Sequence, residues 1–211
     1  MAKDMVYYGL MDAMEGDCCP ICKLIRGRID QMMDGFLYES VNDPRLRKKI
    51  DRSRGFCNEH ARMLMGKGDP LAHALIYREL LALASEDAKK GQFDRYEDRS
   101  GCLFCRQAQK TEEIYAKAFA EGFREREFRE KYAAGGMLCM NHLAAIHAAD
   151  AAVYHKIRQA TEKKYTALME LLDEIRHKND YRFAEEAWSD GARDSWRRAV
   201  AVINDTSGIR K

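Results

Sequence analysis

Apolar residues recur every three to four positions along most of the chain, a spacing that gathers them on one face of a helix. One such stretch covers residues 24–37, and another covers residues 104–119. A third extends over residues 141–178 and is expected to form one unbroken helix with a single buried stripe. Its apolar positions are Leu143, Ile146, Val153, Ile157, Ala160, Leu168, Leu171 and Ile175.

Shorter helices are predicted between these long stretches. Residues 44–51 and 124–132 each form a charged segment of about two turns, and a glycine-containing turn follows at Gly55 or at Gly135-Gly136. A further helix then begins, which in the first half of the chain breaks at the sequence GKGDP and resumes over residues 71–90. Because no stretch shows the alternation of a strand bounded by turn residues, the predicted fold class is all-α.

This order of helices occurs twice, and cysteine and histidine motifs mark the repeat. The chain carries CxxC, CxxH, CxxC and CxxH in that order, and the second half repeats the first at an offset of 82 to 83 residues. The residues are Cys19, Cys22, Cys57, His60, Cys102, Cys105, Cys139 and His142. We therefore predict a first repeat over residues 1–97, a second over 98–178, and a tail over 179–211 that packs on the body.

The tail contains both tryptophans. Asp194 is predicted to cap a short helix whose apolar side comprises Trp196, Ala199, Val200 and Ile203. Packing of this side against the body is the simpler interpretation. The alternative is a docking surface for a partner, because Trp and Arg are enriched at binding hot spots. Its residues would be Trp188, Arg193, Trp196, Arg197 and Arg198.

Composition indicates an ordinary globular protein. The 211 residues are 46% hydrophobic and 33% charged, and 36 basic against 34 acidic residues leave a formal charge of +2. That charge is too small to predict a nucleic-acid binder, and no apolar run is long enough for a signal peptide or a membrane span. We therefore expect a cytoplasmic protein, in which seven cysteines indicate metal binding before disulfides.

The ligand spacing predicts two zinc sites. Two residues three positions apart at the start of a helix can converge on one cation, and one CxxC with one CxxH makes a closed Cys3His set. The grouping predicted from sequence stays within each repeat. One ion is assigned to Cys19, Cys22, Cys57 and His60. The other is assigned to Cys102, Cys105, Cys139 and His142.

Other interpretations of the motifs remain open at this point. Iron–sulfur centres could use the same ligands, although such clusters usually take four cysteines. Eight buried residues without metal, or two CxxC redox pairs, explain the pattern less well, because the redox motif belongs to a βαβ setting and leaves both histidines unexplained. Four protein ligands leave no position for water, so hydrolysis at these metals is not expected.

The remaining polar residues indicate no familiar catalytic site. The sequence has no glycine-rich phosphate loop, no serine nucleophile elbow and no HExxH motif. Cys18 has no cysteine counterpart in the second repeat and is interpreted as a bystander thiol, with a reactive thiol as the alternative. His73, His147 and His155 are expected to be ordinary surface or core histidines.

The motif-bearing segments resemble a known family. They are VNDPRLRKKIDRSRGFCNEHARML, the flanking CPIC, CLFC and LCMNH, and the later YRF and DSWRRAV. Over nearly the whole chain, these segments are similar to a family of uncharacterised prokaryotic proteins, catalogued as a domain of unknown function. The resemblance implies a soluble helical protein of bacteria or archaea.

Three functions are therefore carried forward. The first is a non-catalytic module with two structural zinc ions that binds another protein, and neither nucleic acid nor a membrane is an expected partner. The second is a redox or metal-handling protein with iron–sulfur or labile metal in the same ligand sets. The third is an enzyme with a pocket between the repeats.

Overall fold

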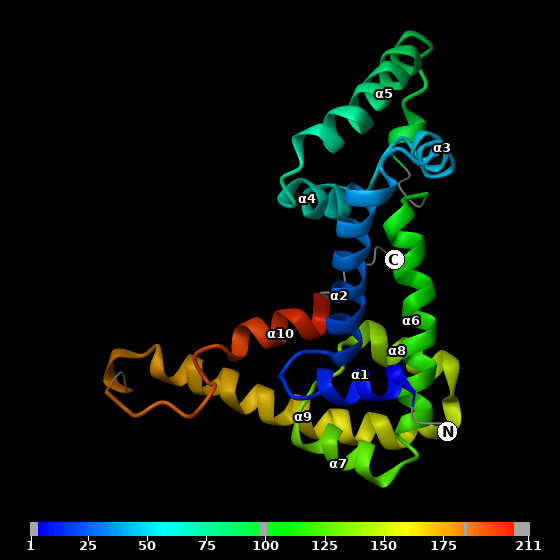
Figure 1. Ribbon diagram of the computed structural model, residues 1–211. Coiled ribbons are helices and arrows are strands. Elements are labelled where there is room, and N and C mark those ends of the chain that lie inside the picture. The colour runs from blue at the N-terminus through cyan, green and yellow to red at the C-terminus, as the bar shows by residue number, and fades with distance from the viewer. Residues whose placement is uncertain (1–3, 98–100, 184, 205–211) are drawn as a thin grey trace. The chain divides into compact units, whose positions relative to one another are not determined.

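The computed structural model describes residues 4–97, 101–183 and 185–204. Within these residues the chain is helical and forms no strand, which confirms the all-α prediction. The α-helices are α1 (Met5–Ala13), α2 (Pro20–Gly35), α3 (Pro44–Arg52), α4 (Asn58–Gly66), α5 (Pro70–Lys89), α6 (Leu103–Gly122), α7 (Arg126–Ala134), α8 (Met140–Ala149), α9 (Ala151–Lys178) and α10 (Ser195–Asn204) (Figure 1). The single turns are η1 (Phe36–Ser40), η2 (Asp94–Tyr96) and η3 (Tyr181–Phe183).

The helices repeat in order, since α2 to α5 correspond to α6 to α9. The long helix predicted over residues 141–178 is wrong in one respect, because the chain breaks at Asp150 between α8 and α9. Asp150 has extended backbone angles, and its carboxylate accepts hydrogen bonds from the Ala152 and Val153 amides. Asp69 caps α5 in the same way by accepting from the Ala72 amide. An aspartate that satisfies free amides at a helix start thus separates the last two helices of both repeats.

The chain divides into two compact units that differ from the sequence repeats. Unit 1 combines the described residues up to Leu24 with those from Glu112 onward, and unit 2 extends from Ile25 to Thr111. Each unit therefore contains helices from both repeats, whereas the sequence predicted boundaries between residues 97 and 98 and between 178 and 179. The first of these predicted boundaries adjoins residues 98–100, which lie outside the described residues.

Aromatic side chains form the core of unit 1 where α1 packs against α7. The Tyr7 and Phe128 rings lie 5.5 Å apart, and Phe119 meets Phe128 edge-on at 5.1 Å. Tyr132 is fully buried beside Phe119, and its hydroxyl lies 2.8 Å from that of Thr161. Burial of large side chains such as these contributes roughly 1.5–3 kcal/mol each, so α7 is anchored next to the segment that leads to Cys139.

Unit 2 has a smaller aromatic core and a buried ion pair. Phe36, Phe56 and Phe104 are all buried, and the Phe56 and Phe104 rings stack at 5.4 Å. The Arg54 guanidinium donates two hydrogen bonds to the Asp87 carboxylate, at 2.5 and 3.1 Å. Both features hold the residues that immediately precede Cys57.

Helix α10 packs on α8 and α9 within unit 1. Val202 is buried in a cluster with Met137 and Leu168. The apolar side predicted from sequence is largely solvent-facing instead, because Trp196, Val200 and Ile203 are 51%, 53% and 65% exposed. The helix contacts the body through a neighbouring face, so these three exposed side chains, called the α10 stripe below, remain accessible.

The structure was also searched for membrane spans. None of the helices in the described ranges combines the length and the apolarity that crossing a bilayer requires.

Candidate metal centres

The structure gathers all eight predicted ligands into two buried clusters, but it groups them across the repeats. The first cluster comprises Cys19, Cys22, Cys139 and His142, and lies in unit 1. The second cluster comprises Cys57, His60, Cys102 and Cys105, and lies in unit 2. The sequence-based grouping within each repeat is therefore wrong, although each cluster still combines one CxxC with one CxxH.

The two repeats differ in the length of the helix that follows each CxxC. In the first repeat, the 16 residues of α2 span about 24 Å and the nine residues of α3 span about 13 Å. In the second repeat the 20 residues of α6 span about 30 Å before the equally short α7. Each CxxH meets the CxxC of the other repeat.

The atoms of the first cluster fit a tetrahedral ion. His142 Nδ1 lies 3.0 Å from Cys139 Sγ, 3.3 Å from Cys22 Sγ and 3.4 Å from Cys19 Sγ. The sulfurs of Cys22 and Cys139 are 3.7 Å apart. Zinc with Zn–S bonds of about 2.3 Å and Zn–N bonds of about 2.0 Å places two sulfurs about 3.8 Å apart and a sulfur and a nitrogen about 3.5 Å apart.

The second cluster has the same arrangement. His60 Nδ1 lies 3.1 Å from Cys57 Sγ, 3.3 Å from Cys105 Sγ and 3.7 Å from Cys102 Sγ. The sulfurs of Cys57 and Cys105 are 3.5 Å apart. In both clusters these separations lie within about half an ångström of the tetrahedral values, so each set could hold one ion.

Helix starts position the ligands. Cys57 and Cys139 are the N-cap residues of α4 and α8, and each histidine follows in the first turn of its helix. Cys19 and Cys102 immediately precede α2 and α6, whose first turns carry the second cysteine of each pair. Thiolates at these positions are stabilised by the positive end of the helix dipole.

Tight turns direct each CxxH into its cluster. Arg54 and Gly136, which are equivalent at the offset of 82 residues, both have positive φ angles, of 53° and 68°. In unit 1 the Gly136 amide donates to the Gly16 carbonyl at 2.6 Å, and the Met137 amide donates to the Cys18 carbonyl at 3.1 Å. These bonds connect the segment before Cys139 with the segment before Cys19.

Close contacts among the sulfurs shift their pKa values in opposite directions. Hydrogen bonds from Cys19 and Cys22 lower the pKa of Cys139, while the bond to Cys139 raises that of Cys22. Burial opposes the charged form of His142, but hydrogen bonding to Cys139 and Cys19 outweighs it and raises that pKa to about 10.

The second cluster shows the same contrast. Hydrogen bonds from Cys105 and Cys57 lower the pKa of Cys102 to about 2. Hydrogen bonds with Cys102 and Cys57 raise the pKa of Cys105. Each cluster therefore combines a cysteine with a lowered pKa and a cysteine with a raised pKa. Metal ligation would displace the remaining protons, as expected for thiolate ligands.

One neighbour of the first cluster had not been singled out from sequence. Glu112 Oε1 lies 3.4 Å from His142 Nε2, on the side of the ring opposite the sulfurs. Glu112 follows Cys105 by seven residues in α6. Seven residues are about two helical turns, so the sequence could have indicated that Glu112 lies on the same helix face as Cys105.

Other polar candidates lie outside both clusters. Cys18 is exposed and belongs to neither group. His147 is exposed, and its ring lies tilted against that of Tyr154 with 4.4 Å between the centroids. His155 is exposed as well. Glu59, between Cys57 and His60 in sequence, faces solvent, so it does not join the ligands.

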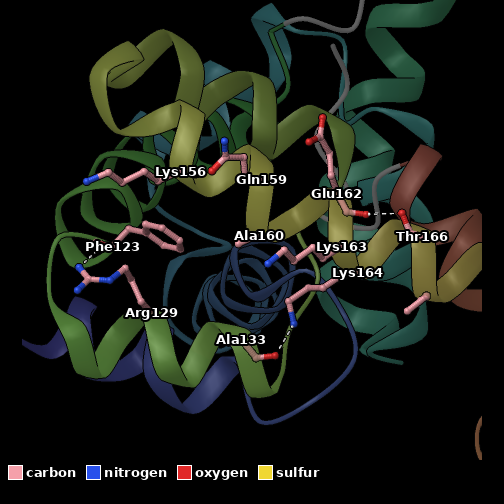
Figure 2. Close-up of a pocket in the computed structure, with 11 residues that line it drawn as sticks. Phe123, Arg129, Ala133, Lys156, Gln159, Ala160, Glu162, Lys163, Lys164 and Thr166 are labelled. Carbon is pink, nitrogen blue, oxygen red and sulfur yellow. Dashed lines mark hydrogen bonds between the residues drawn. The ribbon is translucent and has the colours of Figure 1, made fainter.

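A hollow of about 750 Å³ lies between α7 and α9 within unit 1 (Figure 2). Its charged groups are largely engaged by the protein itself. Arg129 donates to the Phe123 carbonyl, and Lys164 donates to the Ala133 carbonyl at 3.1 Å. Glu162 accepts from Arg158 at 2.6 Å. Because both helices belong to the second repeat, this hollow is not the pocket between the repeats that an enzyme was expected to have.

Comparison with known proteins gives a consistent family. The model of a family of unknown function (DUF6062) matches residues 1–98 and 84–209, two overlapping stretches that agree with the duplication. The chain is also similar to an "Uncharacterized 23.9 kDa protein in xynA 3'region" from Caldicellulosiruptor sp. (strain Rt8B.4), at 34% identity over 203 residues. That match covers 93% of this chain and 100% of the relative. No solved structure matches the chain.

Proposed function

The chain belongs to the family of unknown function DUF6062, and we propose that this protein binds two zinc ions as permanent structural centres. The observation that carries the proposal is the spacing of the ligand atoms. In each cluster, four buried atoms lie within 4.8 Å of one another. Three sulfurs and one nitrogen at this spacing make a closed Cys3His set, which zinc commonly occupies.

The role that follows is structural. Four protein ligands leave no open position for water or substrate, so the ions would not act as catalysts. Each ion would join the start of a CxxC helix to the start of a CxxH helix from the other repeat. The free energy of metal binding would thereby stabilise a connection between distant parts of the sequence.

Zinc is preferred to iron–sulfur centres for two reasons. Histidine is the less common ligand of such clusters, and both sets here contain one. A cluster of several irons also places metal and bridging sulfide between its ligands, which requires a wider separation than a single ion. A redox or metal-handling function in the same ligand sets is the alternative that metal analysis distinguishes.

The zinc-stabilised body would serve as a cytoplasmic accessory module that binds another protein. The α10 stripe supports this part of the proposal, because Trp196, Val200 and Ile203 lie on one helix face and are each more than half exposed. Large apolar side chains that remain accessible together are typical of protein-binding surfaces.

Elemental analysis tests the central claim. Protein purified anaerobically without chelator should contain about two zinc ions per chain and be colourless. Iron with visible absorbance would support the redox alternative and refute structural zinc. Protein that folds without any metal would refute both metal-binding proposals.

A further inference from the structure

The two clusters differ at one position beyond the ligands. Seven residues after the second cysteine of each CxxC, α6 carries Glu112 and α2 carries Ile29. Both side chains are buried, since Glu112 is 8% exposed and Ile29 is 0% exposed. The duplication therefore placed a carboxylate and an aliphatic group at equivalent helix positions.

The carboxylate lies beside a predicted ligand. His142 is fully buried and directs Nδ1 toward the three sulfurs of the first cluster. Its Nε2 atom lies on the other side of the ring, 3.4 Å from Glu112 Oε1. A neutral imidazole that ligates a metal through Nδ1 carries its hydrogen on Nε2, and that hydrogen needs an acceptor.

Among the residues that the structure describes, no carboxylate lies this close to the histidine of the second cluster. His60 also directs Nδ1 toward its sulfurs. Within the described residues the buried Nε2 atoms of both histidines make no hydrogen bond, so the clusters differ in the nearby carboxylate oxygen, which only His142 has. The aromatic ring of Phe104 lies beside His60, with 5.7 Å between the ring centroids. Its environment is therefore less polar than that of His142.

We propose that Glu112 is a positioning residue that makes the first cluster the tighter zinc site and leaves the second cluster the more exchangeable one. This inference rests on the proposed binding of two zinc ions. With the metal bound, Glu112 would accept the Nε2 hydrogen across this 3.4 Å separation, hold the His142 ring with Nδ1 toward the metal, and strengthen the ring as a ligand. Removal of such an outer partner typically weakens metal affinity by about 10- to 100-fold.

Two zinc ions of unequal stability have a functional consequence. Under metal limitation or in the presence of a competing thiol-rich acceptor, the second cluster loses its ion first. Because its ligands all come from unit 2, the loss would affect Cys57, His60 and their surroundings while the first cluster stays closed.

Zinc transfer to an excess of a chromogenic chelator tests the proposal. The wild-type protein should release two equal portions of zinc, one fast and one slow. Glu112→Ile, which copies the residue at the equivalent position of α2, should accelerate only the slow portion, by about 10- to 100-fold. Glu113→Ile changes the adjacent exposed residue and should leave both rates unchanged.

A conservative variant separates hydrogen bonding from packing. Glu112→Gln keeps an acceptor oxygen, so it should retain most of the slow release. The role of Glu112 would be overturned if Glu112→Gln released its slow zinc as fast as Glu112→Ile does. It would also be overturned if Glu112→Ile changed the fast portion, or if it changed the slow portion no more than Glu113→Ile does. A wild-type protein that contains no zinc would instead refute the proposed function itself.

Discussion

Paired serine substitutions test which ligands share an ion. Cys22→Ser with Cys139→Ser damages only the first cluster, because both sulfurs belong to it and lie 3.7 Å apart. Cys22→Ser with Cys57→Ser damages both clusters, because Cys57 belongs to the second. The two double variants lose the same number and type of ligands, so each is the matched control for the other.

The structure determines the expected zinc content of each variant. A closed site needs its four ligands, so the Cys22 and Cys139 variant should keep about one zinc per chain, while the Cys22 and Cys57 variant should keep about none. The cost in stability should differ as well. Structural zinc in small peptides contributes an apparent 10–16 kcal/mol or so of binding free energy that is coupled to folding. Loss of both ions should therefore lower the melting temperature much further than loss of one.

Elemental analysis after gel filtration measures zinc content, and circular dichroism measures helicity and thermal stability. The opposite result, with one zinc in the Cys22 and Cys57 variant and none in the Cys22 and Cys139 variant, would show that each repeat holds its own ion. That outcome would refute the grouping across the repeats.

Three further predictions concern the surroundings of the clusters. Gly135→Ala should destabilise the protein by about 1–3 kcal/mol in urea unfolding, because a Cβ atom would lie 2.1 Å from the Met14 carbonyl oxygen, whereas Gly27→Ala, in open space on α2, should be neutral or stabilising. Equal changes in the free energy of unfolding for Gly135→Ala and Gly27→Ala would contradict the predicted clash at Gly135. Cys18→Ser should leave zinc content unchanged, and a lost ion would make Cys18 a ligand. Hydrogen bonding to Arg54 lowers the pKa of Asp87. The ionised Asp87 carboxylate should therefore stabilise the folded protein fully above about pH 4, and this contribution should decline as the pH falls further. Urea unfolding of Asp87→Asn should show a weaker acid dependence, and an unchanged one would refute the role of the ion pair.

Local sequence patterns determined the helices and the identity of the ligands. An apolar period of three to four residues is a property of neighbouring positions, so it predicted an all-α fold before any packing was known. Two ligands at positions i and i+3 likewise converge through the geometry of a single helix turn, which is why Cys19 with Cys22 and Cys139 with His142 could be recognised as pairs. The offset of 82 to 83 residues revealed the duplication from the same motifs.

Only the tertiary structure decided which pairs meet and what surrounds them. Nothing in the spacing of Cys22 and Cys57 states that each of them joins ligands from the other repeat. The interruption at Asp150 was also missed, because an aspartate fits a helical pattern until its side chain is seen to cap the following helix. Glu112 contacts a histidine 30 positions away in sequence. Contacts between distant segments depend on the lengths and directions of whole helices, and local periodicity carries no record of either.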